Sequence, residues 1–454
     1  MRVTLINSPV SKVIEKRYDT PDYPHIGIGY LASYLTANKI NCNVIDAKLE
    51  RLTLDSTIER LKDIKPDVIG FTAMTNDIVR TSQVASAIKK ELRNTTMVIG
   101  GVHATALPKE TMRDFSVFDF LVHNEGEIVL YKLVKMLESN KGDYDSIKGI
   151  AFRKNGNIYV NQQEEWITDL DNLPNPGWEL FPRASEYPIM TARGCPFKCI
   201  FCMRPNADKV RKRSPENVIS ELEKVINKYQ PSRIVFWDET FSIDLERIHR
   251  ILDLIIEKGL NKRVKWYTQT HVNTVNYELF RKMKEAGCFM VGLGMESGDK
   301  DILKATKKGI TLERIEAAAK EAKEAKLDVE GYFILGHPNE TKETAKKTIN
   351  FAVRVNPTFP VFGIMVPYPG TEVAKMAEMG IGNYKLLSRN WSDYNKQIGN
   401  ALELNNLSRK ELEKLQLIAY LKVYVFNLRI LDLLKFIIKY WAEGIAFAFN
   451  FLKK

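Results

Sequence analysis

The sequence predicts an α/β protein in three parts: an N-terminal doubly wound, Rossmann-like domain, a central partial (βα)6 TIM-like barrel, and a C-terminal helical domain. Short apolar runs alternate with amphipathic segments in two successive series along the 454 residues, and this alternation stops at about residue 385. Such alternation is typical of parallel sheets covered by helices. We expect domains at 1–142, 187–385 and 386–454, with a linker that contains a hairpin at 143–186.

Composition places the chain among ordinary globular proteins. It is 44% hydrophobic and 27% charged, with a formal net charge of +11. No single basic run dominates, so solvated lysine-rich helix faces explain the charge, and we expect no nucleic-acid partner. The first residues read as a strand rather than a signal peptide, and no run of 18 uncharged apolar residues occurs. We expect a cytoplasmic protein, with peripheral contact at the inner membrane face as a further possibility.

The first 140 residues predict five parallel strands, at 3–6, 42–45, 68–71, 97–99 and 120–122. In doubly wound sheets, ligands bind beyond the carboxyl ends of the strands. Two glycines there would let the backbone approach a bulky ligand, although turn formation explains them equally well. The candidate residues at these ends are Ser8, Pro9, Thr72, Gly100, Gly101, His103, Glu125, Gly126 and Glu127.

The second series begins after a connecting segment. Residues 150–160 read as a hairpin around Asn155-Gly156-Asn157, and a segment rich in proline and turn-forming residues follows at 169–178. Six strands are then expected, near 187–191, 233–237, 264–268, 290–294, 331–335 and 362–366. Right-handed crossovers would close them into a partial barrel, whose chemistry belongs at the carboxyl-terminal rim.

Three of the five cysteines lie within eight residues, as Cys195, Cys199 and Cys202 with C-x3-C-x2-C spacing. Thiolates are soft ligands, and cysteines crowded in this way indicate a metal site. Structural zinc normally takes four protein ligands, and a disulfide would strand the third cysteine. The interpretation that uses all three is a [4Fe–4S] cluster with one iron open to a small molecule; zinc is the alternative. The other two, Cys42 and Cys288, read as buried inert thiols.

With these motifs the chain resembles radical S-adenosylmethionine (SAM) enzymes that carry a cobalamin-binding domain, over roughly residues 1–385. An aromatic residue, Phe201, precedes the third cysteine as in that family. The remaining matching segments are 24–32, 100–103, 125–127, 213–218, 236–241, 292–298, 331–338, 340–341 and 366–371.

This resemblance implies three cofactors: a [4Fe–4S] cluster on the three cysteines, SAM chelated to the open iron, and cobalamin on the first domain. An electron from the cluster would cleave SAM to methionine and a 5′-deoxyadenosyl radical. Asp238 and Glu239 would receive the amine of SAM, and Glu296 and Ser297 its ribose; a solvated turn and a rim salt bridge are the alternatives for these acids. Adenine contacts are expected from Phe201, Gly336 and Pro367.

One departure concerns cobalt. The D-x-H-x-x-G motif that supplies a cobalt ligand in other cobalamin proteins is absent, because Asp22 and His25 stand at the wrong spacing. The resemblance therefore implies that cobalamin binds without that histidine. A domain that kept its fold and lost its cofactor is the alternative.

No catalytic residue is indicated by the sequence alone. The candidates at the rim are His271, Tyr332 and Tyr368, for which hydrogen bonding or core packing is the alternative. His337 reads as a turn residue.

The C-terminal segment is predicted to be helical. Apolar residues recur on one arc of 415–443, and 444–454 is apolar with a basic end. These helices could pack across the barrel mouth, contact a membrane surface, or form an apolar entrance for a lipid-like substrate.

The family resemblance implies an enzyme, a cobalamin-dependent radical SAM methyltransferase that acts on an unactivated carbon or a phosphinate phosphorus. A radical cyclase, rearrangement or carbon–carbon coupling without methylation is the alternative, with or without cobalamin. An iron–sulfur electron-transfer or sensing protein is a third. The expected partners are a small-molecule or lipid-like substrate and an electron donor such as flavodoxin or ferredoxin. The sequence does not indicate the oligomeric state.

Overall fold

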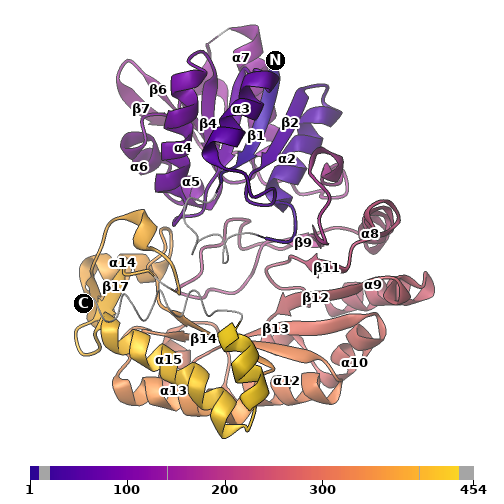
Figure 1. Ribbon diagram of the computed structural model, residues 1–454, viewed down its shortest axis with the longest axis vertical. Helices are drawn as coiled ribbons and strands as arrows, with labels where there is room; N and C mark the ends of the chain where they lie inside the picture. Colours follow the sequence, from indigo (N-terminus) through magenta and orange to yellow (C-terminus); the bar gives the residue numbers. More distant parts are fainter. Residues whose placement is uncertain (10–20, 141, 398, 439–454) are drawn as a thin grey trace.

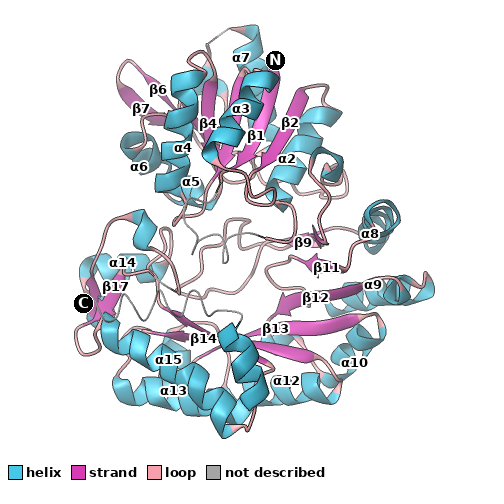
Figure 2. Ribbon diagram, viewed as in Figure 1, coloured by secondary structure: helices cyan, strands magenta, loops and turns pink. Residues whose placement is uncertain are grey.

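The computed structural model describes residues 1–9, 21–140, 142–397 and 399–438. Two sheets lie in separate lobes that face each other, with the N-terminal lobe uppermost in Figure 1. Helices cover the outer surfaces of both sheets (Figure 2). The α/β class and the Rossmann and partial-barrel architecture predicted from the sequence are present.

The N-terminal sheet has the strand order β2-β1-β3-β4-β5-β6-β7. Strands β1 to β5 are parallel and almost continuously buried, as expected for strands covered on both faces. Their bounds are Arg2–Asn7, Asn41–Asp46, Val68–Thr72, Thr96–Gly100 and Phe120–Val122. The helices are α2 (Ile26–Ala37), α3 (Leu54–Ile64), α4 (Ile78–Glu91), α5 (Val102–Ala106), α6 (Pro108–Asp114) and α7 (Glu127–Ser139).

The hairpin β6 (Ile150–Lys154) and β7 (Asn157–Val160) extends this sheet antiparallel to β5, with Phe120 opposite Phe152. Burial of Ala151 and Phe152 explains the pairing, because this hairpin completes the edge of an apolar sheet. It therefore belongs to the first lobe rather than to a linker.

The second sheet has six parallel strands in the order β15-β14-β13-β12-β11-β8 and remains open between its two edges. The strands are β8 (Glu186–Ile189), β11 (Arg233–Phe236), β12 (Lys265–Thr270), β13 (Cys288–Glu296), β14 (Asp328–Leu335) and β15 (Phe359–Ile364). The helices are α8 (Pro215–Tyr229), α9 (Leu245–Glu257), α10 (Tyr277–Glu285), α11 (Lys300–Ala305), α12 (Leu312–Glu324), α13 (Lys342–Val355) and α14 (Glu372–Met379).

The C-terminal part is less helical than predicted. A short antiparallel pair, β16 (Tyr384–Leu386) and β17 (Leu402–Leu404), precedes the helix α15 (Arg409–Phe426). Only the first turns of α15 reach the rim, where Leu412 lies beside Gly336. The rest packs along α13 and β15. None of the described helices is long and apolar enough to cross a membrane.

Helix α15 protects the edge strand β15. The amide of Gln416 donates to the carbonyl of Phe362 at 2.6 Å, and the N–H of Phe362 donates to the hydroxyl of Tyr420 at 3.1 Å. An uncovered edge of this kind would pair readily with other chains. The helix therefore caps the open barrel at this edge instead of lying across its mouth.

Candidate functional site

The cysteine loop leaves the barrel after β8 and runs between β9 (Ala192–Arg193) and β10 (Arg211–Lys212), which pair antiparallel. Its entry requires a glycine: Gly194 has φ +98°, and a Cβ there would lie 2.5 Å from the carbonyl of Lys209. Met203 of the loop and Ala106 of the first lobe both lie within 3.6 Å of the Cβ position on Gly370. The loop, the Rossmann edge and the segment after β15 therefore meet.

The three cysteines of the loop are free thiols, half-buried at Cys195 and Cys199. Burial raises the pKa of Cys199 to about 12, while the ammonium of Lys308 opposes that shift. Burial also raises the pKa of Cys202, and the nearby Cys195 raises it further. A raised pKa means that these thiols do not ionise readily on their own, but a bound metal cation stabilises the thiolate form. Three cysteine sulfurs are therefore a donor set that fits iron.

In the described part of the chain, no three His, Cys, Asp or Glu side chains converge on a single point that could hold one metal ion. A cluster does not demand such convergence, because each of its cysteines binds a different iron. The arrangement of Cys195, Cys199 and Cys202 is therefore compatible with the predicted cluster.

Two histidines flank the loop, each against one of its phenylalanines. His271 stacks on Phe197 with ring centroids 3.6 Å apart and planes 5° apart, and His337 meets Phe201 edge-on at 6.0 Å. Burial lowers the pKa of both histidines to about 4, so both are neutral near pH 7.

Both histidines carry unpaired ring nitrogens. Nδ1 of His271 accepts from the N–H of Asn273 at 3.2 Å, but among the described residues its Nε2 has no partner within ordinary hydrogen-bond geometry, and the backbone of Lys308 is the polar group near the ring. In the described part of the chain, neither ring nitrogen of His337 has a partner within ordinary hydrogen-bond geometry, although this side chain is fully buried and the backbone of Glu296 lies close enough to raise its pKa against the effect of burial. Buried polar groups are normally hydrogen-bonded, so these nitrogens point to a ligand. The sequence indicated only that His337 is a turn residue. It did not indicate that the side chain of His337 is fully buried.

Glu296 ends β13 at φ +60° and forms a buried ion pair with Lys308 at 2.5 Å. The same ammonium donates to the carbonyl of Gly294 at 2.8 Å. A Cβ on Gly294 would lie 2.1 Å from Lys308 Nζ, so a side chain there would displace the ammonium from its place beside Glu296. The prediction that Glu296 binds ribose stays a prediction, and the sequence did not indicate its partner Lys308.

The acids after β11 occupy different surroundings. Asp238 accepts from the N–H groups of Thr191 and Ala192, at 2.6 and 3.2 Å, and from the Thr191 hydroxyl. Burial raises the pKa of Asp238 to about 6 despite these bonds. Glu239 accepts from the N–H of Gly194 at 3.2 Å and from the Asn206 amide at 2.6 Å, at the base of the cysteine loop. Glu239 is therefore the better candidate to receive an amine, and Asp238 fixes the strand that precedes the loop.

The other predicted SAM and catalytic residues lie around this rim. Ser297 is buried and hydrogen-bonds Thr348 at 3.0 Å. Gly336 has φ +89° and donates its N–H to Glu340, while Pro367 is buried beyond β15.

The two candidate tyrosines lie away from one another. Tyr332 donates to Glu330 at 2.5 Å and accepts from Gln269 at 2.9 Å, inside the barrel sheet. Burial raises the pKa of Tyr368 to about 12, and the nearby Asp77 of the first lobe raises it further. Tyr368 therefore lies toward Asp77 at the Rossmann edge, whereas Tyr332 lies near Tyr23 of the N-terminal segment.

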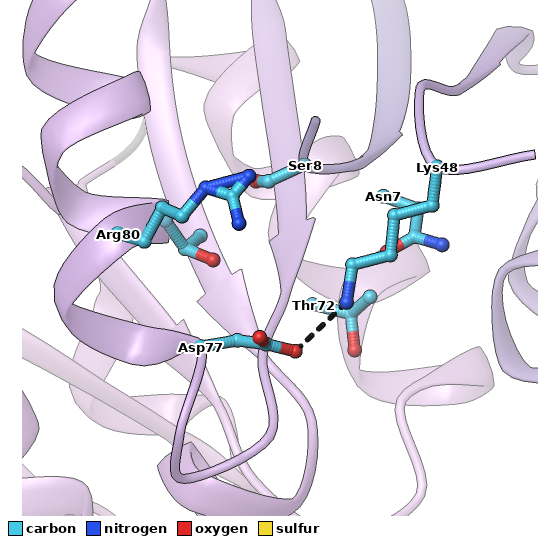
Figure 3. Close-up of a pocket in the computed structure, with 7 residues that line it drawn as sticks. Asn7, Ser8, Lys48, Thr72, Asp77 and Arg80 are labelled. Atoms are coloured by element: carbon cyan, nitrogen blue, oxygen red, sulfur yellow. Dashed lines mark hydrogen bonds and ion pairs between the residues drawn. The ribbon is translucent and has the colours of Figure 1, made fainter. Parts of the chain in front are cut away.

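A small polar pocket, with a cavity volume of only about 10 Å³, lies at the carboxyl ends of β1 and β3, where the strand order reverses (Figure 3). An ion pair of Lys48 and Asp77, 2.9 Å apart, lines it together with Arg80. Ser8 lies at its wall, almost fully buried, and its hydroxyl has no hydrogen-bond partner among the described residues. Ligands of doubly wound sheets bind at such switch points, and the unpaired hydroxyl fits a hydrogen-bonding ligand.

Of the two predicted glycines, Gly100 ends β4 and Gly101 follows it in a conformation that favours glycine. Gly101 has φ +92°, and a Cβ there would lie 2.7 Å from the hydroxyl of Thr72. His103 packs edge-on against Trp391, with ring centroids 5.1 Å apart. Its Nδ1 lies 3.4 Å from the hydroxyl of Thr75, and burial lowers its pKa to about 4. The structure therefore uses His103 to join the first lobe to the C-terminal part.

The predicted cobalamin contacts Glu125 and Glu127 are bonded elsewhere. Arg193 donates to Glu125 at 2.8 Å and to Glu127 at 2.7 Å, and Arg211 donates to Glu125 at 2.7 Å. All four side chains are buried. Although burial lowers the pKa of Arg193, the two carboxylates raise it above its usual value. These acids therefore join the Rossmann edge to the base of the cysteine loop, and Gly126 lies between them.

Comparisons with known proteins match both lobes. Residues 189–352 match the radical SAM superfamily, and residues 18–134 match the B12 binding domain. An uncharacterized methyltransferase of Pyrococcus horikoshii is 33% identical over 434 residues, which cover 94% of this chain and 93% of that protein. The chain belongs to the radical SAM superfamily. Its group within the superfamily carries a B12 binding domain, and its cofactors are a [4Fe–4S] cluster, SAM and cobalamin.

Other relatives extend the comparison. The anaerobic magnesium-protoporphyrin IX monomethyl ester cyclase of Cereibacter sphaeroides is 29% identical over 77% of this chain and 59% of that protein. The structure of the radical SAM methyltransferase TsrM from Kitasatospora setae, with cobalamin and a [4Fe–4S] cluster bound, matches with a TM-score of 0.74 at 16% identity. That match covers 94% of this chain and 89% of the other, and it confirms the predicted fold.

Proposed function

We propose that this protein is a cobalamin-dependent radical SAM methyltransferase that acts on an unactivated carbon, or a phosphinate phosphorus, of a small molecule. The observation that carries the proposal is the meeting of two sites. The cysteine loop touches the segment around Gly370, which also touches the Rossmann edge at Ala106. A radical site and a methyl-carrying site must lie close together for a methyl group to pass to a substrate radical.

The residues of the rim would hold the cofactors in this arrangement. Cys195, Cys199 and Cys202 would hold the cluster, Glu239 would accept hydrogen bonds from the amine of SAM, and Ser8 would bond to cobalamin. When bound, the cluster and SAM supply a 5′-deoxyadenosyl radical, and cobalamin supplies a transferable methyl group.

Neutral imidazoles next to the loop complete the site. His271 and His337 each offer an unpaired nitrogen that can donate or accept, depending on the tautomer. Their low pKa values keep them uncharged over the physiological range, so they orient polar groups rather than add positive charge. Phe197 and Phe201 exclude water from the same space, which protects a reactive radical.

The experiment that tests this proposal needs no known substrate. The anaerobic chain, loaded with cluster and cobalamin, is given methyl-labelled SAM and a strong reductant. We expect S-adenosylhomocysteine to form, with the label on the corrinoid, and neither when cobalamin is omitted. 5′-Deoxyadenosine without any S-adenosylhomocysteine would contradict methyl transfer.

A second function, cyclisation without methylation, is favoured by one observation. The magnesium-protoporphyrin ester cyclase relative aligns with this chain at 29% identity over 364 residues. The same labelling experiment separates the two functions, because 5′-deoxyadenosine alone is the product expected of the cyclase.

We further propose a one-electron donor such as flavodoxin or ferredoxin, because a cluster must be reduced before it cleaves SAM. The expected cytoplasmic location would supply one. Replacing the chemical reductant by reduced flavodoxin should sustain SAM cleavage. A preparation that cleaves SAM with the chemical reductant but not with reduced flavodoxin or ferredoxin would contradict this partner.

A further inference from the structure

Exposed apolar side chains gather at the C-terminal end of the described chain. Of the nineteen large hydrophobic side chains that are exposed in the described residues, ten lie between Leu417 and Ile438. Leu428 is 87% exposed, and Leu431 and Ile438 are each 74% exposed. Scattered exposed apolar residues are normal, but a contiguous group of this kind marks an interaction surface.

This surface has two helical parts. Helix α15 buries Leu412, Leu415, Ala419 and Val423 against α13 and β15, so Leu417, Leu421 and Val425 follow one another on its outer face. Asn427 ends the helix, and residues 430–438 form a second helical segment. Figure 1 shows both parts, in yellow, on the side of the barrel away from the Rossmann lobe.

The second segment is fixed to the barrel. Arg429 donates to the carbonyls of Pro357 and Thr358, and its guanidinium lies over the ring of Tyr424 at 5.1 Å. Phe436 stacks on Tyr420 with centroids 4.9 Å apart. The inner side of this segment is therefore packed on the barrel, and its exposed leucines lie on the opposite, outer side.

Charge decides which partner fits this surface. Between residues 412 and 438 the acids are Glu413 and Asp432, which pair with Arg409 and Arg429 at 3.0 and 2.9 Å. The lysines at 414, 422 and 435 have no acid partner in that range, and Lys422 lies over the exposed ring of Phe426 at 5.7 Å. A second copy of the chain would bring the same lysines together, whereas anionic lipid would neutralise them.

We propose that the surface formed by residues 417–438 docks the protein on an anionic membrane. The leucines and isoleucines would enter the boundary between headgroups and acyl chains, and the lysines would contact the headgroups. This placement does not depend on which reaction the barrel performs. It would give the enzyme access to membrane-borne molecules.

Co-sedimentation of the full chain with lipid vesicles tests the proposal. We expect binding to vesicles of phosphatidylcholine with about 30% phosphatidylglycerol to be at least about tenfold tighter than to phosphatidylcholine alone, and to weaken at high salt. Leu431→Glu should weaken binding by about tenfold or more, because it puts a charge where the leucine enters the lipid. Met379→Glu is the matched control: Met379 is 65% exposed on α14, outside the surface, and this variant should bind as the unchanged chain does.

Three results would overturn the proposal. One is that the unchanged chain binds neither vesicle. Another is that Leu431→Glu binds vesicles as well as the unchanged chain. This result would count against the surface even if removal of residues 439–454 abolished binding. The last is that sedimentation velocity without lipid shows a dimer that Leu431→Glu dissociates, with no vesicle binding. The cluster absorbance of each variant, unchanged, establishes that the chain is folded.

Discussion

Two buried polar regions of this molecule differ in how completely their groups are bonded. At the junction of the lobes, the carboxylates of Glu125 and Glu127 are paired with Arg193 and Arg211, and only Nε of Arg211 lacks a partner among the described residues. At the barrel rim, His337 is as deeply buried, yet neither ring nitrogen forms a hydrogen bond of ordinary geometry with a described residue, and the backbone of Glu296 is the polar group beside it. Burying an unbonded polar group costs free energy that a bonded one does not.

The difference separates residues that hold the structure from residues that await a ligand. Arginine–carboxylate pairs such as Arg193 with Glu127 orient one lobe on the other. Nε2 of His271, both ring nitrogens of His337 and the hydroxyl of Ser8 in the Rossmann pocket form no hydrogen bond of ordinary geometry within the described chain and would gain one when a ligand binds. Substitutions should therefore change stability in the first group and ligand affinity in the second.

The largest effect is expected at the cluster ligands. Cys199→Ala should abolish both the brown iron–sulfur absorbance and SAM cleavage, because two thiolates cannot hold the cluster. Cys288→Ala is the control, since that thiol is buried in β13 outside the cysteine loop. Visible spectra of the anaerobically reconstituted proteins and product analysis check both. SAM cleavage by Cys199→Ala would refute the assignment of the cluster.

At the junction, Arg193→Met should lower the free energy of unfolding by about 3–5 kcal/mol, because it leaves the buried carboxylate of Glu127 without a partner. Adding Glu127→Met should recover much of the loss, since both charges are then gone. Urea unfolding of the single and double variants gives the comparison. A single variant within about 1 kcal/mol of the unchanged chain would mean that the junction is solvated rather than structural.

At the rim, His337→Phe should behave in the opposite way. It removes two ring nitrogens that form no hydrogen bond of ordinary geometry within the described chain and have only the backbone of Glu296 nearby, so the free energy of unfolding should fall by less than about 1 kcal/mol. Affinity for SAM should fall about tenfold, the value of one lost hydrogen bond of roughly 1.4 kcal/mol. Equilibrium binding of SAM to the reconstituted protein checks this. Lower stability of His337→Phe with unchanged affinity for SAM would mean that His337 stabilises the fold and does not contact the ligand.

The smallest effect is expected in the Rossmann pocket. Ser8→Ala should weaken cobalamin binding about threefold to tenfold through loss of one neutral hydrogen bond, while stability is kept. Ser86→Ala, in α4 but outside the pocket lining, should bind cobalamin normally. Titration with hydroxocobalamin measures both. Equal affinity of the two variants would remove Ser8 from the cobalamin site.

The sequence predicted what depends on local pattern. Strands such as 68–71 and 233–237 are visible as apolar runs because both faces of parallel strands are buried. The cysteine spacing is likewise local. The C-terminal pair β16 and β17 was missed, since three-residue strands leave no readable period.

Contacts between distant residues could not be predicted. Glu125 and Arg211 are 86 positions apart, and nothing in either neighbourhood indicates the other. Lys307 and Lys308 are adjacent in the sequence, yet the first pairs with Glu372 at the surface and the second is buried against Glu296. Which of two lysines enters a site depends on the path of the chain after β13.

Anaerobic reconstitution with iron, sulfide and hydroxocobalamin, followed by desalting and a visible spectrum, measures whether one chain holds a radical site and a corrinoid site together. We expect both chromophores to remain, with about one corrinoid and four irons per chain. A spectrum with the cluster and no retained corrinoid would mean that the first lobe does not hold cobalamin beside the cysteine loop.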